Sequence, residues 1–168
     1  SVAERFLPEL FGALADKGVR IHGDELACKA ALAAGEKRLP TDAALQVERA
    51  SEQDWETEYL SPDLAVRCVS GPEQAIVHIN RYGTMHSEAI VADPKLPEGA
   101  AAIERFVNEV DAAAVYVNAS TAFTDGGMFG LGAEIGISTQ KLHVRGPFAL
   151  EGLTSYKYVL RGTGQVRA

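Results

Sequence analysis

Short apolar runs alternate with longer amphipathic segments through the middle of this sequence, and the alternation limits the possible folds more than any other feature. Three runs are rich in valine, isoleucine and alanine and have the length of strands: 64–70, 87–93 and 113–118. The two segments between them, 72–83 and 96–110, carry apolar residues at helical spacing. This order is typical of parallel crossover units, so the sequence predicts an α/β domain with a mainly parallel sheet.

The first 63 residues predict a helix, a strand and a second helix, followed by a polar segment. Apolar residues in the first 14 positions recur at helical spacing, and Gly18 would end that helix. Pro8 predicts a slight kink in the helix or a later start. Residues 19–23 alternate like a short strand, and Asp24 stands where the N-cap of the next helix belongs. In the polar segment, residues 44–47 predict another short strand.

A glycine-rich stretch follows the last predicted strand. Six of the chain's sixteen glycines lie between Gly126 and Gly146, a density that indicates unusual backbone dihedrals or close approach to another group. The strand that ends at Asn118 brings this loop to the carboxyl edge of the sheet, where ligands of open α/β sheets bind. The loop lacks the Lys-Ser/Thr of a Walker motif and the third glycine of a Rossmann fingerprint, which argues against nucleotide phosphate binding there.

Composition and charge argue against several classes of partner. The net charge is −7, and the basic residues are scattered among acidic ones, so we expect no nucleic acid partner. No apolar run approaches the roughly 20 residues that span a bilayer, and the first residues lack the layout of a secretory signal. We therefore expect a cytoplasmic protein without a membrane partner. Two cysteines make no disulfide framework, and we expect both to be reduced.

The residues alone offer no reacting group. Cys28 lies in an alanine-rich helical segment and Cys68 alternates with valine in a predicted strand, so both are expected to pack as small hydrophobes. The four histidines show no metal-ligand spacing, and a G-x-S-x-G nucleophile elbow is absent from the sequence. We therefore predict a ligand-binding loop without a metal site or a catalytic residue.

Four stretches of the sequence resemble one enzyme family. They are DWETEYLSPDLAV (54–66), INRYGTMHSEAIVAD (79–93), VYVNASTAFTDGGMFGLGAEIGISTQKLHVRGP (115–147) and LTSYKYVLRGTGQVR (153–167). They resemble the C-terminal part of gamma-glutamyl phosphate reductase, also called glutamate-5-semialdehyde dehydrogenase, of the aldehyde dehydrogenase superfamily. The resemblance covers nearly the whole chain and implies a three-layer, parallel-sheet catalytic domain. Residues 1–150 would form the C-terminal part of that domain, and residues 151–168 an oligomerisation strand and tail.

The resemblance also implies an activity. The family reduces gamma-glutamyl phosphate to glutamate 5-semialdehyde with NADPH in proline biosynthesis, through a thioester on a cysteine nucleophile. In the family this cysteine stands just upstream of the segment that SVAERFLPEL resembles. The chain is therefore expected to be a fragment that begins after its own nucleophile, and to be inactive alone.

By position, the resemblance assigns binding roles to four residues. Glu58 falls where the superfamily places a glutamate that hydrogen-bonds the nicotinamide ribose, and the alternative is a carboxylate on a solvated loop anchored by Trp55. Asn118, Ser120 and Thr121 lie on a segment that resembles the substrate-side loop, where they would donate hydrogen bonds to the glutamyl group.

Two positions depart from the family's pattern. Ala122 replaces the usual arginine after NAST, and Met128 replaces the usual acidic residue after the paired glycines. Each change is either neutral or has removed a substrate contact. A substrate with a carboxylate and an acyl phosphate requires cations, and Arg145 is a further candidate, with an ordinary salt bridge as the alternative.

The segment LTSYKYVL resembles the superfamily's oligomerisation strand, which pairs across a subunit interface, so the resemblance implies a homodimer or a tetramer. Two other functions stay open. One is the reductase module at the end of a bifunctional pyrroline-5-carboxylate synthase, which the length of the parent reading frame would decide. The other is a binding or assembly module that has lost its catalytic half, which an upstream cysteine would exclude.

Overall fold

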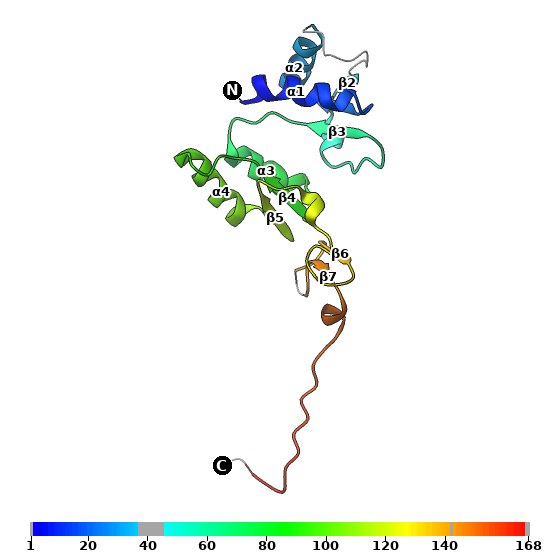
Figure 1. Cartoon of the computed structure of the whole chain (residues 1–168), viewed down its shortest axis with the longest axis vertical. Helices are drawn as coiled ribbons and strands as arrows, with labels where there is room; N and C mark the ends of the chain where they lie inside the picture. The colour runs from blue at the N-terminus through cyan, green and yellow to red at the C-terminus, as the bar shows by residue number, and fades with distance from the viewer. Residues whose placement is uncertain (1, 37–45, 142, 167–168) are drawn as a thin grey trace. The chain divides into compact units, whose positions relative to one another are not determined.

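A computed structural model describes residues 2–36, 46–141 and 143–166 (Figure 1). The chain divides into two compact units, Ser1–Gly83 and Thr84–Ala168. Each unit contains a parallel sheet together with helices, so the predicted α/β class is confirmed. Among the described residues, no helix is long and apolar enough to cross a membrane.

The first unit is built on a three-stranded parallel sheet. Its strands are β1 (Arg20–Gly23), β2 (Gln46–Arg49) and β3 (Asp63–Val66), in the order β2-β1-β3. Its helices are α1 (Val2–Ala15), α2 (Glu25–Glu36), the short 3-10 helix η1 (Glu52–Trp55) and α3 (Pro72–Tyr82). Of the strand predicted at 44–47, the first two residues lie outside the described ranges, and β2 begins at Gln46.

The core of this unit lies where α1, α2 and β1 meet. Phe11 of α1 and Ile21 of β1 are fully buried, and burial of each side chain stabilises the fold by about 1.5–3 kcal/mol. The helix runs unbroken from Val2 with Pro8 inside it, so the predicted later start is wrong. Gly18 has a φ of +67°, which suits the turn that follows α1.

Asp24 connects two elements of the first unit. One carboxylate oxygen accepts a hydrogen bond from Ala27 N at 2.9 Å, which confirms the predicted N-cap of α2. The other accepts from Cys68 N at 2.8 Å. The strand predicted at 64–70 therefore ends early, at Val66, because the chain beyond it bonds to this side chain rather than to a neighbouring strand.

The second unit combines a parallel pair of strands with an antiparallel pair. Strands β4 (Ser87–Ile90) and β5 (Ala114–Val117) are parallel and are joined through α4 (Pro97–Glu109). Strands β6 (Ile135–Ile137) and β7 (Gly146–Phe148) are antiparallel. Two 3-10 helices complete the unit, η2 (Thr121–Phe123) and η3 (Leu150–Leu153). The structure thus forms the second of the two predicted crossovers, β4-α4-β5, with strands of four residues each. The first one, β3-α3-β4, is not formed within one sheet among the described residues, because β3 pairs with β1 instead of β4.

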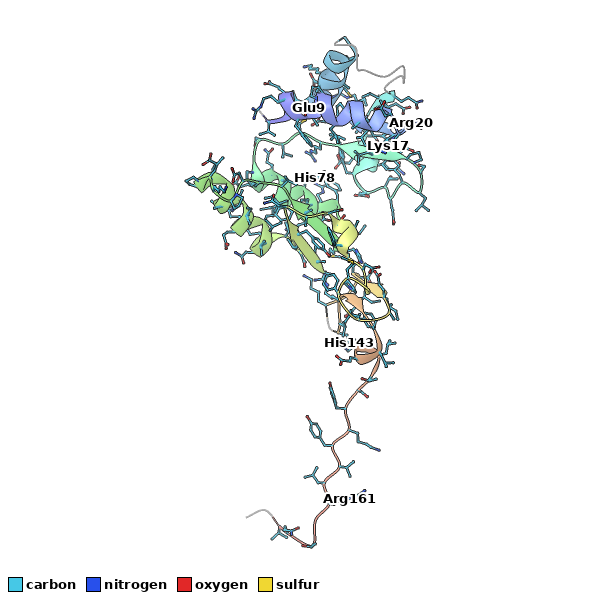
Figure 2. The ribbon with its side chains drawn as sticks, in the orientation of Figure 1. Glu9, Lys17, Arg20, His78, His143 and Arg161 are labelled. Carbon is cyan, nitrogen blue, oxygen red and sulfur yellow. The ribbon has the colours of Figure 1, made fainter. Side chains whose placement is uncertain are left out.

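Residues 154–166 have no helix or strand (Figure 1). All of these residues are exposed. Tyr156, Tyr158 and Leu160 are about nine-tenths exposed, and Arg161 lies on the same extended segment (Figure 2). The sequence alternates here like a strand, but no strand among the residues that the structure describes pairs with it. Its pairing with a second chain stays a prediction.

Candidate functional site

The carboxyl ends of β4 and β5 carry the loop that contains three of the residues predicted to bind a ligand. Asn118 follows β5 with a φ of +53°, and its backbone N donates to Ile90 O at 2.8 Å. Its side-chain oxygen accepts from Ala92 N and its side-chain nitrogen donates to Ala92 O, both at 2.9 Å. The amide thus extends the pairing of the two strands, and one of its N–H groups is already used.

Ser120 and Thr121 follow directly on the same loop. The Ser120 hydroxyl oxygen accepts from Ala122 N at 3.1 Å and so caps η2. Its own hydrogen stays available for donation, since a hydroxyl both accepts and donates. The Thr121 side chain is exposed, and Thr124 Oγ1 lies 2.8 Å from the hydroxyl of Tyr116 in β5. Tyr116 of β5 therefore contacts the residue that follows η2, and Ser120 and Thr121 present two exposed hydroxyl groups at its start.

Gly126 shows why the glycine-rich stretch needs glycine. A Cβ built at this buried residue would lie 2.0 Å from Ala133 O. Its backbone N donates to a Glu134 carboxylate oxygen at 3.1 Å, and its carbonyl accepts from Leu131 N at 2.8 Å. The glycine density predicted unusual backbone dihedrals or close approach to another group. At Gly126 the second holds, and the group is the chain's own backbone.

The candidate cation Arg145 bonds to groups of its own unit. Its guanidinium lies 3.4 Å from an Asp111 carboxylate oxygen and donates to Met85 O at 3.2 Å. Lys141 pairs with the other oxygen of Asp111. This geometry agrees with the salt-bridge alternative for Arg145. Of the two departures from the family pattern, Ala122 is exposed and Met128 is 64% exposed.

Glu58, the fourth predicted site residue, lies in the first unit on residues 56–62, which we name the Glu58 segment. Its carboxylate is exposed and makes no hydrogen bond or ion pair to the residues that the structure describes. The segment around it is fixed by several bonds. Thr57 Oγ1 donates to Gln53 O at 2.8 Å, and Pro62 O accepts from Arg20 N at 2.9 Å.

A cluster that sequence analysis missed lies beside the Glu58 segment. Nε2 of His22 is 2.8 Å from an Asp63 carboxylate oxygen, and Nδ1 is 3.3 Å from an Asp54 oxygen. Tyr59 stacks on the His22 ring at 4.9 Å and donates its hydroxyl to Asp54 at 2.5 Å. That hydroxyl, with bonds from Ser51, lowers the pKa of Asp54 to about 2. No local spacing in the sequence could have indicated this cluster, because His22 and Asp63 are 41 residues apart.

The other side of η1 packs on α3. Trp55 meets the His78 ring edge-on at 5.5 Å, and Arg67 donates to His78 Nδ1 at 2.8 Å (Figure 2 labels His78). Burial and this guanidinium lower the pKa of His78. Tyr82 donates its hydroxyl to Glu52. Trp55 therefore anchors η1. The alternative that places Glu58 on a solvated loop also predicted an anchor at Trp55.

Neither cysteine has the environment of a nucleophile. Cys28 Sγ lies 3.4 Å from Gly23 O within the first unit, and both thiols are free. Burial and the Asp24 carboxylate raise the pKa of Cys68, which disfavours the reactive thiolate. Within the described ranges, no three His, Cys, Asp or Glu side chains are placed to hold a metal ion.

Comparison with known proteins gives strong matches along nearly the whole chain. A gamma-glutamyl phosphate reductase of Bacillus mycoides (strain KBAB4) is 53% identical over 165 residues, which cover 98% of this chain. One of Bacillus cereus (strain B4264) is 52% identical over the same length. The resemblance to gamma-glutamyl phosphate reductase is confirmed. The crystal structure of that reductase from Thermotoga maritima matches 99% of the chain at 46% identity, with a TM-score of 0.78.

These matches cover only part of each related protein. The chain spans 35% of the length of the two Bacillus reductases and 36% of the Thermotoga chain. No family model matches the chain.

Proposed function

We propose that the protein of which this chain forms part is an NADPH-dependent gamma-glutamyl phosphate reductase of proline biosynthesis. The observation that carries the proposal is the 53% identity over 98% of the chain to a reductase of that name. The aligned length includes both the Glu58 segment and the loop after β5. The product would be glutamate 5-semialdehyde, and the protein would be cytoplasmic.

The reaction would need a cysteine outside this chain, since Cys28 and Cys68 are poorly suited to attack. That thiolate would add to the acyl phosphate of the substrate, expel phosphate and form a thioester. When bound, NADPH supplies the hydride that reduces the thioester to the aldehyde. The chain by itself would then be inactive.

The residues of this chain would bind and orient the reactants. The exposed carboxylate of Glu58 has no partner among the described residues, and it fits the hydroxyl groups of a ribose because a carboxylate is an acceptor only. Ser120 and Thr121 would donate their hydroxyl hydrogens to the glutamyl group. Asn118 would contribute its remaining N–H and hold the loop to β4 through Ala92.

In this proposal, residues 1–150 form the C-terminal part of the catalytic domain, and residues 151–168 form an oligomerisation strand and tail. The exposed side chains of Tyr156 and Tyr158 support pairing of that strand with a second copy, which would give a homodimer or a tetramer. Light scattering of the parent protein at micromolar concentration tests this. A monomer would contradict it.

The test of function is reductase activity of the parent protein against activity of this chain alone. We expect gamma-glutamyl phosphate-dependent NADPH oxidation from the parent protein and none from the chain. A folded parent protein without activity would favour a non-catalytic binding or assembly module. A parent that also phosphorylates glutamate would be a bifunctional pyrroline-5-carboxylate synthase.

Two variants of the parent test the site assignments. Glu58→Ala should weaken NADPH binding, and replacement of Ser120 by alanine should raise the KM for gamma-glutamyl phosphate. A loss of one hydrogen bond corresponds to about a fivefold change in each constant. If calorimetric titration gives the same NADPH Kd for Glu58→Ala and the parent, Glu58 is a solvated surface residue.

A further inference from the structure

We infer that His22, Asp54, Asp63 and Tyr59 are positioning residues that hold Glu58 in the conformation that binds the dinucleotide. The inference rests on the proposed function, because it needs Glu58 to contact the cofactor. It adds four residues that do not touch a ligand themselves. They act through the Glu58 segment.

The geometry concentrates several interactions on the residue next to Glu58. Tyr59 is held by its ring, which stacks on His22 with an interplanar angle of 15°, and by its hydroxyl, which donates to Asp54. The side chains of His22 and Asp54 are 12% and 17% exposed. A stacked ring and a charge-assisted hydrogen bond fix both the position and the rotation of Tyr59.

The His22 ring joins the two ends of the Glu58 segment. Asp54 lies in η1 before the segment, and Asp63 begins β3 after it. Asp63 lies 2.8 Å from one nitrogen of the ring and Asp54 3.3 Å from the other, so the ring bridges the two carboxylates. Ser61 Oγ adds a bond to Asp63 at 2.6 Å. His22 itself lies in β1, the central strand of the sheet, which gives the arrangement a rigid base.

This arrangement favours ligand binding because an ordered segment has less conformational freedom to lose. Tyr59 donates to Asp54 and Thr57 donates to Gln53, so the exposed side chain of Glu58 lies between two anchored neighbours. If the binding conformation falls to one fifth of the population, the apparent Kd rises about fivefold, which corresponds to about 1 kcal/mol. That is the effect expected when one bond of the cluster is removed.

The test uses the full parent protein, with NADPH binding measured by calorimetric titration and exchange of the amides of the Glu58 segment measured by mass spectrometry. Tyr59→Phe keeps the stacked ring and removes only the hydroxyl, and His22→Gln removes the ring. We expect about a fivefold higher Kd for NADPH in Tyr59→Phe, more in His22→Gln, and faster amide exchange in the segment. The KM for gamma-glutamyl phosphate should change less than the NADPH Kd.

Tyr116→Phe is the matched control. It also loses one hydroxyl, but that hydroxyl meets Thr124 in the second unit. The NADPH Kd of this variant should stay within about twofold of the parent. If Tyr59→Phe and His22→Gln lower only the thermal stability and leave the NADPH Kd unchanged, the cluster is merely structural and the inference is wrong.

Glu58→Ala separates this inference from the proposed function. A weakened NADPH Kd in Glu58→Ala beside an unchanged Kd in Tyr59→Phe would overturn the positioning role alone. An unchanged Kd in Glu58→Ala would remove the assigned role of Glu58, and the positioning inference with it. In that case the reductase activity of the parent protein would still test the proposed reaction.

Discussion

Replacement of Gly126 by alanine should destabilise the loop after β5. The added Cβ would lie 2.0 Å from Ala133 O and 2.9 Å from the Glu134 Cβ. Comfortable contacts between non-bonded heavy atoms begin near about 3.5 Å, so the backbone at one of these positions must move by more than about 1 Å. The atom that obstructs the Cβ is backbone, and no rotation of a side chain relieves the contact.

The expected magnitude follows from that movement. Overpacking of a tight site typically costs about 1–3 kcal/mol. The movement would also stretch the bond from Gly126 N to Glu134, and loss of a hydrogen bond to a charged group costs about 1.5–3 kcal/mol. Part of the strain can relax, because residues 127–136 are exposed, so we expect a loss of about 2–3 kcal/mol.

Scanning calorimetry of the parent protein measures this effect. A loss of 2 kcal/mol lowers the Tm of a domain of 150–250 residues by about 4–8 °C. Gly127→Ala is the matched control, since its Cβ would meet only the end of the Asp125 side chain, at 2.9 Å, and that side chain can move. Gly127→Ala should therefore change the Tm far less. Equal Tm values for the two variants would show that the loop does not pack against residue 133 in the native protein.

Three further predictions concern the first unit. Asp24→Ala should destabilise it by about 2–4 kcal/mol, because the helix cap and the bond from Cys68 N are both lost. Asp24→Asn should lose less unfolding free energy because it can still cap α2. Urea unfolding measures both variants. Phe11→Ala should cost about 3–5 kcal/mol in the same assay, and an effect below 1 kcal/mol would contradict its full burial. The pKa of Asp54 is lowered from 3.8 to about 2, so its stabilisation is present above pH 4 and lost as the pH falls towards 2. Tyr59→Phe, which lacks the main cause of that shift, should show a shallower loss of unfolding free energy between pH 4 and 2, by at most about 2 kcal/mol.

Much of the fold could be predicted from local sequence. The alternation after residue 63 indicated β4, α4 and β5 because strand and helix periodicities differ, and each pattern needs only neighbouring residues. Asp24 was predicted as an N-cap for the same reason, since its partner is three residues away. The first helix was predicted, and only the alternative of a later start at Pro8 was wrong, because the core around Phe11 stabilises α1 more than one missing backbone hydrogen bond destabilises it.

The loop that carries three of the candidate site residues could be predicted from sequence, and the binding roles of these residues stay a prediction. Asn118, Ser120 and Thr121 are adjacent in sequence, so one loop carries them together, but the bonds of Asn118 to Ala92 could not be predicted from spacing. The pairing partner of the extended segment around Tyr158 could not be predicted from the sequence either. An alternating pattern indicates which residues suit a strand, and it does not indicate which strand they pair with.

The sequence by itself determined the order of the α-helices and of the strands β1 to β5, the cap of α2 and the place of the glycine-rich loop, because each depends on residues a few positions apart. The tertiary structure decided that His22 lies between Asp54 and Asp63, and that Gly126 packs on Ala133. The position of His22 between the two carboxylates requires β1 to lie at the centre of a sheet whose order is β2-β1-β3. That order depends on which strands pair and in which register, and long-range pairing leaves no periodic signal in the chain.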